Sequence, residues 1–179
     1  FGGDRSYVRT DEGAPKGRVF SVDPARLDRA AWKEIVPEDP KRPLKWVRRL
    51  GGKLVLGYLD DVKSRIEVHD ADGRLERLVD LPGVGTAGLS GHPDDDDAFL
   101  WFSTFVQPTQ IYETSVTKGG LSLYTEVKVP FDPKPYVVEQ IFAMSKDGTR
   151  VPAFVVRRRG SPLDGSTPTF DSPKWERQG

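Results

Sequence analysis

A chain of 179 residues is long enough for one or two domains, and its 36% of hydrophobic residues and 18 glycines give an apolar fraction that is ordinary for a globular protein. The 27 basic and 27 acidic residues cancel, so no overall field favours nucleic acid or an anionic membrane. The lack of cysteine excludes disulfides and thiolate metal sites, and no apolar run reaches the roughly 18 residues of a membrane-spanning helix. The lack of cysteine fits a reducing compartment weakly, and both the cytoplasm and the periplasm stay open.

The first forty residues predict an incomplete β unit. Residues 1–10 stand where the second strand of a four-stranded unit should be, residues 18–23 follow as its third strand and residues 32–37 as its fourth. Because no first strand precedes them, we expect the sequence to be a piece of a larger protein.

The most regular stretch is residues 53–82, which predicts three strands in a meander. Asp60 and Asp61 mark its first turn, and Asp72 with Gly73 marks the second, because glycine accepts the positive φ of tight hairpin turns. The expected strands are residues 54–59, 65–68 and 75–81, and residues 44–50 precede them as a fourth.

The same unit recurs later in the chain. With a shift of 45 residues, residues 54–56 fall on 99–101 and residues 64–66 fall on 109–111. Four strands every 42 to 47 residues is the spacing of β-propeller blades. We therefore expect a mostly β fold with about two and a half four-stranded antiparallel blades: two complete ones at residues 44–82 and 84–130, and a partial one before them.

A different pattern follows the Pro-rich link at residues 131–135. Two strands, residues 136–144 and 150–157, flank a turn at residues 145–149. We expect the first strand to have one covered face and the second to be buried more deeply. The resulting domains are residues 1–135 for the blades, 136–170 for the new hairpin and 171–179 for a tail.

The hairpin carries the clearest resemblance to a known family. Residues 145–152, which read SKDGTRVP, resemble the prolyl oligopeptidase family of serine peptidases, as do LKWV at 44–47, LVLGYLDDVKS at 54–64 and FSTF at 102–105. The likeness runs from about residue 7 to 169, and the tail departs from it. In that family a seven-bladed propeller caps an α/β-hydrolase domain, so the resemblance implies the last blades followed by the first hydrolase strands.

The resemblance also implies a function for the parent protein. It would be a serine endopeptidase that cleaves short peptides after proline, with the propeller restricting access to the active site. The family's Ser, Asp and His lie beyond the end of this chain, so we expect no catalytic residue, no cofactor and no metal here, and an inactive isolated chain. The expected partners are the remaining blades and the hydrolase domain, not nucleic acid or a membrane. The alternative is a propeller-type protein-binding module without activity.

Four groups of residues resemble sites, and each has a simpler interpretation. Ser90 lies in GLSGH, which lacks the second glycine of a Gly-x-Ser-x-Gly nucleophile elbow, so we interpret it as part of a turn. The consecutive aspartates 94–97 lack the spaced pattern of a calcium loop and predict a solvated hairpin tip. His69 and His92 occupy non-equivalent blade positions without a third ligand, which predicts surface or capping roles. Arginines 157–159 predict a solvated strand edge or an interdomain ion-pair site.

Overall fold

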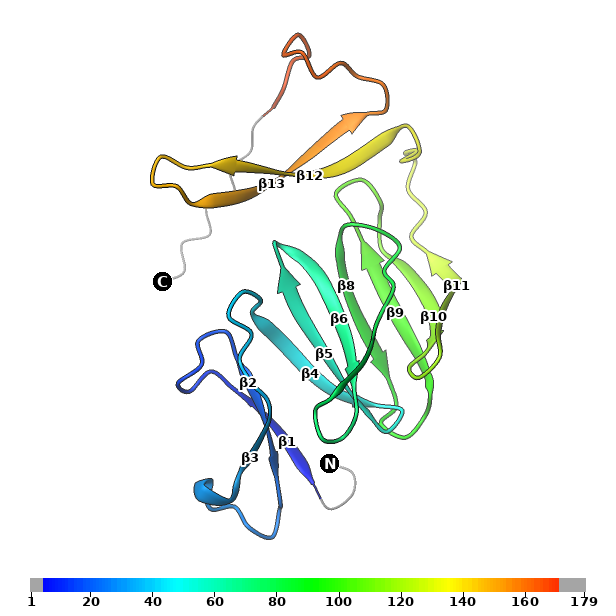
Figure 1. Ribbon diagram of the computed structural model, residues 1–179. Helices are drawn as coiled ribbons and strands as arrows, with labels where there is room; N and C mark the ends of the chain where they lie inside the picture. The colour runs from blue at the N-terminus through cyan, green and yellow to red at the C-terminus, as the bar shows by residue number, and fades with distance from the viewer. Residues whose placement is uncertain (1–4, 171–179) are drawn as a thin grey trace.

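The computed structural model describes residues 5–170, which form antiparallel sheets and contain, apart from the short 3₁₀ turn η1 (Arg29–Ala31), only strands and their connections (Figure 1). In this part of the chain no helix is long and apolar enough to cross a membrane.

Three sheets follow one another along the chain, and each is a meander in which consecutive strands pair. The first has three strands, β1 (Ser6–Thr10), β2 (Arg18–Val22) and β3 (Lys33–Val36). The second has four, β4 (Leu44–Leu50), β5 (Lys53–Asp60), β6 (Lys63–His69) and β7 (Leu75–Leu78). The third has four, β8 (Thr86–Gly91), β9 (Asp97–Ser103), β10 (Gln110–Ser115) and β11 (Gly119–Glu126). The expected partial blade and two four-stranded blades are therefore confirmed.

Alternation along the strands gives each sheet two packing faces, and the sheets stack through them. On β5, Leu54 and Leu56 face the first sheet, whereas Val55 faces the third. The first cluster joins the first and second sheets: Val19, Ile35, Val36, Leu44, Leu54, Leu56 and Tyr58. The second cluster joins the second and third sheets: Leu50, Val55, Ile66, Val68, Val79, Ala87, Leu89, Ala98, Leu100, Phe102 and Val116.

The repeat shift of 45 residues is wrong by one for the second strand of each blade. Leu56 pairs with Val47 and faces the preceding sheet, and the residue in that place on β9 is Leu100, which pairs with Leu89. The correct shift there is 44 residues (56 to 100), and because strand side chains alternate, the error exchanges the two faces. The shift of 45 holds for the third strand, because Gly57 and its partner Ile66 are nine positions apart, whereas Trp101 and its partner Ile111 are ten apart.

The turn between β5 and β6 also differs from the expected one. Asp60 is still in the ladder, paired with Lys63, so Asp61 and Val62 form the two-residue turn. Both have positive φ, 46° for Asp61 and 63° for Val62, as the hairpin twist requires. A β-branched residue is disfavoured there, so Val62 is a point of backbone strain.

The last two strands form a separate hairpin, β12 (Tyr136–Met144) and β13 (Arg150–Arg158), whose predicted arms and turn are confirmed. The expected deeper burial of β13 is wrong: Val151 and Val156 are exposed, and Phe154 is half-buried. The reason is that the two strands mainly contact each other and meet the blades at few places, such as Phe154 with Phe105. Figure 1 shows the hairpin lying across one end of the stacked sheets.

Candidate interaction surfaces

Ser90 lies near the end of β8, directly before a hairpin turn into β9. Its hydroxyl donates to the carbonyl of Phe99 across the strand pair, at 3.4 Å. A nucleophile elbow needs a strand-to-helix turn, whereas this segment is strand, turn and strand. His92, beyond the strand end, is exposed, and its Nδ1 accepts the backbone N–H of Asp94.

Asp94 and Asp96 at the β8–β9 tip have partners within the structure, so the prediction of a solvated tip holds only in part. The carboxylate of Asp96 accepts the Ser115 hydroxyl at 2.5 Å and the Thr117 N–H at 2.8 Å. The hydrogen bond from Ser115 is the largest cause of the lowered pKa of Asp96. Asp94 pairs with Arg49 of β4 at 3.0 Å. Residues 5–170 contain no group of three or more His, Cys, Asp or Glu that could hold a metal ion.

His69 is buried, so the surface role expected for it is wrong, whereas its bond to the β6–β7 turn agrees with the alternative, a capping role. Only 5% of the residue is exposed, at the end of β6. Its Nε2 lies 2.9 Å from a carboxylate oxygen of Glu67, and its Nδ1 lies 2.9 Å from the carbonyl oxygen of Gly73. In the sequence, residues 65, 67 and 69 alternate onto one face of β6. Because these residues are polar, the pattern predicts a face open to solvent and not a buried one.

Arg157 contributes to the hairpin itself rather than to an edge or a domain contact. Its guanidinium donates two hydrogen bonds to Glu139 on β12, at 2.7 and 3.0 Å. This forked pairing lowers the pKa of Glu139 and raises that of Arg157. Arg158 and Arg159 follow at the end of β13, where Arg159 donates its backbone N–H to Pro135.

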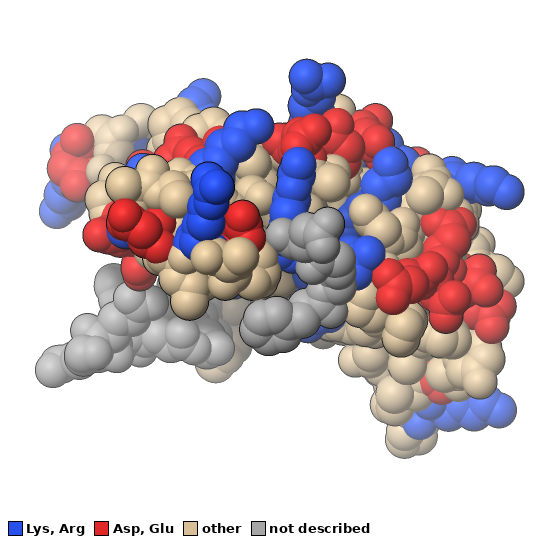
Figure 2. All heavy atoms as spheres, turned by 90° about the horizontal axis from the view of Figure 1, so that it is seen from below, with Lys and Arg blue, Asp and Glu red and all other residues tan. Residues whose placement is uncertain are grey.

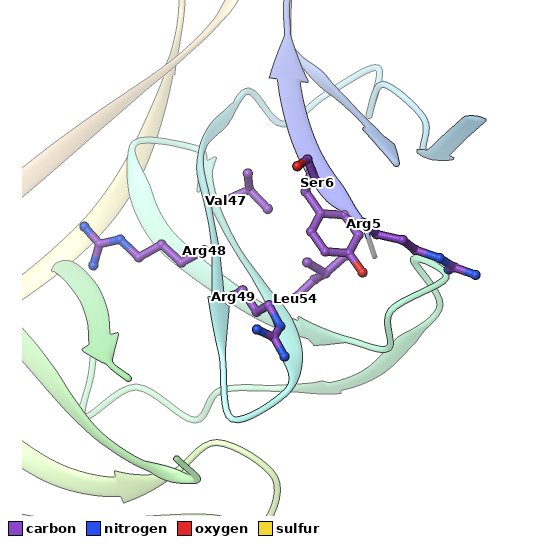
Figure 3. Close-up of a pocket in the computed structure, with 7 residues that line it drawn as sticks. Arg5, Ser6, Val47, Arg48, Arg49 and Leu54 are labelled. Atoms are coloured by element: carbon purple, nitrogen blue, oxygen red, sulfur yellow. The ribbon is translucent and has the colours of Figure 1, made fainter. Parts of the chain in front are cut away.

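The first open surface is the free edge of β1. Among the described residues β1 pairs only with β2, whereas β5 and β9, the second strands of the later sheets, pair on both sides. A cavity of about 200 Å³ lies beside this edge. Figure 3 shows Arg5 and Arg48 pointing away from each other, so the cavity is not a convergent basic site. The lining residues are Arg5, Ser6, Tyr7, Val47, Arg48, Arg49 and Leu54.

The second open surface is the outer face of the third sheet. Phe99, Trp101 and Tyr124 are exposed there, and the rings of Phe99 and Tyr124 meet edge to face at 5.3 Å. Single exposed aromatics are ordinary, but a cluster on a sheet face is typical of an interaction site. Figure 2 shows basic and acidic side chains interspersed over the face that it presents, without a field of one sign.

Two tryptophan–glycine pairs show that this open face is built like the face at the interface between the second and third sheets. Trp46 on β4 lies over its cross-strand partner Gly57, where no Cβ would fit. Trp101 on β9 likewise covers its partner Gly88. Trp46 packs into the interface between the second and third sheets. The open face carrying Trp101 therefore has the construction of an interblade face.

The third surface joins the hairpin to the blades. Gln140 donates to the carbonyl of Asp61, and Arg150 approaches the Asp61 carboxylate at 3.8 Å. The rings of Phe105 and Phe154 are 5.1 Å apart. These contacts place the strained β5–β6 turn against the hairpin.

Comparison with known proteins agrees with this architecture. The family model for the prolyl oligopeptidase N-terminal β-propeller domain matches residues 2–127. A prolyl endopeptidase of Elizabethkingia meningoseptica is 33% identical over 169 residues, 94% of this chain and 24% of the relative. One solved prolyl endopeptidase has a TM-score of 0.81 and 52% identity, covering 89% of this chain and 24% of that one.

A more distant structure has the same fold. Prolyl oligopeptidase B from Galerina marginata, solved without ligand, has a TM-score of 0.78 and 26% identity, covering 92% of this chain and 24% of its own. The chain thus spans about a quarter of the length of the relatives it matches. It belongs to the prolyl oligopeptidase family, with residues 2–127 forming part of the β-propeller domain.

Proposed function

We propose that this chain is the closing part of the propeller, together with the first hairpin of the α/β-hydrolase domain, of a serine endopeptidase that cleaves short peptides after proline. The observation that carries the proposal is the extent of the likeness. The propeller model ends at residue 127, but the match to prolyl endopeptidases covers 94% of the chain and so includes residues of the β12–β13 hairpin. A free-standing propeller has no need of such a hairpin.

In this proposal the blades have a gating role. The outer face of the third sheet receives the next blade, and the free edge of β1 receives the inner strand of its own blade. A propeller closed in this way covers the active site and admits only short, flexible peptides. The hairpin contact at Asp61 then holds the cap against the hydrolase domain.

The chain contributes structure rather than chemistry to that reaction. Acyl transfer at a peptide bond needs an activated hydroxyl, a base and oxyanion donors. The Ser90 hydroxyl is bonded to a backbone carbonyl, and both nitrogens of His69 are bonded to acceptors. We therefore expect no turnover of a prolyl peptide by the purified 179-residue chain. Turnover that Ser90→Ala abolishes would contradict this.

A chimera tests the proposed function. In the Elizabethkingia meningoseptica enzyme, the aligned 169-residue segment is replaced by the corresponding part of this chain. We expect a folded hybrid that cleaves a Gly-Pro-nitroanilide substrate and excludes a folded protein substrate. The matched control carries Ser90→Ala and should be equally active. A hybrid that unfolds cooperatively, labels with a fluorophosphonate probe and still ignores proline would overturn the proposal, and the binding module would then be preferred.

A further inference from the structure

Two acceptors hold the buried imidazole of His69. Its side chain is 6% exposed, and each ring nitrogen lies 2.9 Å from an oxygen, Nε2 from the Glu67 carboxylate and Nδ1 from the Gly73 carbonyl. A carbonyl and an ionised carboxylate can only accept. Both ring nitrogens must then donate, which only the imidazolium form can do.

Neighbouring groups keep Glu67 ionised. Burial opposes its charge, but hydrogen bonds from His69 and Arg65, the latter at 2.7 Å, outweigh the burial and lower the pKa of Glu67. Arg42 adds a longer contact to Glu67 at 3.9 Å and is itself paired with Asp39. The other titratable or charged residues on the elements around the imidazole are Lys53, Tyr58 and Asp60 on β5, Lys63 on β6, Asp70, Asp72 and Arg74 in the β6–β7 turn, Glu76 and Arg77 on β7, Lys33 and Glu34 on β3, Tyr7 and Arg9 on β1, and Arg5 directly before β1.

His69 bonds to Gly73 in the β6–β7 turn, and the first sheet packs against the same turn. Gly73 has a φ of 86° and no room for a Cβ, because the Ile35 carbonyl of β3 lies against it. Tyr7 of β1 donates its hydroxyl to the Ala71 carbonyl at 3.3 Å. Arg5 pairs with Asp72 at 2.9 Å. Contacts from two sides of the first sheet therefore converge on one turn.

We propose that charged His69 is a proton-dependent clamp of the junction between the first and second sheets, which loosens when the imidazole loses its proton. The neutral ring keeps one N–H, so it must release either the Glu67 carboxylate or the Gly73 carbonyl. Either loss takes a hydrogen bond from an oxygen beside the buried ring. The Gly73 loss also removes the bond between the imidazole and the turn, which is then held by its own hydrogen bonds through Asp70.

The direction of the pH dependence follows from the same contacts. Burial disfavours the charged ring, but the hydrogen bonds to Glu67 and Gly73 outweigh it, and the pKa of His69 is raised above its usual value. A raised folded-state pKa contributes stability that is complete below the unfolded-state pKa and is lost as the pH rises through the folded-state pKa. The clamp is therefore closed below the unfolded-state pKa of the imidazole and opens as the pH rises through the raised folded-state pKa.

Deuterium exchange at the imidazole Cε1 position, followed by mass spectrometry across a pH series, measures the protonation of His69 in the 179-residue chain or any longer protein that contains it. We expect its transition to lie above that of the same peptide in denaturant. His92 is the only other histidine and serves as an internal control. A His69 transition at or below that of the denatured peptide would overturn the proposal.

Amide exchange in residues 70–74 and in β3, corrected for intrinsic rates, tests the junction itself. We expect opening to increase by about tenfold through the His69 transition, the factor for losing one hydrogen bond to a charged group. His69→Gln should show the fast rate at every pH, and His92→Gln should behave as the unaltered chain. If His69→Gln does not fold, the unaltered chain still decides: junction exchange that ignores the His69 transition refutes the clamp.

Discussion

Two tryptophans lie over glycines at matching places in consecutive sheets, but the order of the pair is reversed. In the second sheet Trp46 is on the first strand and Gly57 on the second, whereas in the third sheet Gly88 is on the first and Trp101 on the second. One tryptophan ring therefore fills this place in each of the two sheets, and it comes from the first strand in one and from the second strand in the other. The volume of the pair, rather than the identity of either residue, is what close packing requires.

This complementarity predicts a rescue. Trp46→Gly should destabilise the chain by about 3 kcal/mol by removing a large packed ring, and Gly57→Trp alone should cost about 1 to 3 kcal/mol or more by overpacking. The exchange double variant should regain about 1 to 2 kcal/mol relative to their sum, because it reproduces the arrangement of the third sheet. Urea unfolding of the four proteins measures the coupling.

A distant tryptophan provides the control for that cycle. Trp32, beside η1, is not among the atoms nearest Gly57, and its ring lies 6.0 Å from that of Phe20 at a tilt of 59°. Combining Trp32→Gly with Gly57→Trp should give additive losses. Equal coupling in both cycles would mean that the pairing of Trp46 with Gly57 has no specific energetic role.

At the scale of the element, strand positions could be predicted from the sequence far better than their registers. Residues 44–50 and the arms of the final hairpin were predicted nearly to the residue, because each is a run of alternating or apolar side chains between turn residues. The alignment of β9 with β5 was wrong by one residue, since a shift of 45 puts Trp101 in the place of Leu100. The number of residues between matching strands sets the correct shift, and the similarity of the repeats alone does not reveal that number.

The burial of His69 was missed for a related reason. Its neighbours on one face of β6 are Arg65 and Glu67, which predict a solvated face when read singly. Their mutual pairing lets that face be covered by the first sheet, and this depends on packing between segments more than thirty residues apart, such as Gly73 and Ile35. The free edge of β1, in contrast, follows from counting the strands of the first blade.

The β5–β6 turn provides a test of strain within one element. Val62 is held at a φ of 63°, a conformation that costs a β-branched residue about 1 to 3 kcal/mol, and the residue is 45% exposed. Val62→Gly should stabilise the chain by about 1 kcal/mol, after subtracting the backbone entropy that glycine loses. The measurement is the midpoint of urea unfolding.

Val62→Ala is the matched variant, because it shortens the side chain but still requires a positive φ. We expect it to give less stabilisation than Val62→Gly, or none. If alanine and glycine were equivalent, the strain would lie in side-chain packing near Phe105 and not in the backbone.

At the scale of the whole molecule, the two interfaces buried between sheets and the surfaces left uncovered determine how the isolated chain behaves. Leu56, Tyr58 and Phe102 are already covered by neighbouring sheets, whereas Trp101 and Phe99 are not. Burying one such side chain is worth about 1.5 to 3 kcal/mol, and the whole margin of a domain is about 5 to 15 kcal/mol. The unpaired edge of β1, in the first sheet, adds a separate row of free backbone groups.

We therefore expect the isolated chain to dimerise through its open surfaces, to aggregate, or to remain bound to a complementary fragment. Replacing Phe99 and Trp101 together by lysine should weaken this association by about tenfold or more, because it places charge at the centre of the face. Phe170→Lys is the control, since Phe170 is 90% exposed outside the sheets and its loss should change nothing. Sedimentation velocity with a hydrophobic dye reports both effects, and a dye-free monomer with a sharp, reversible thermal transition would show that the open blade faces do not drive association.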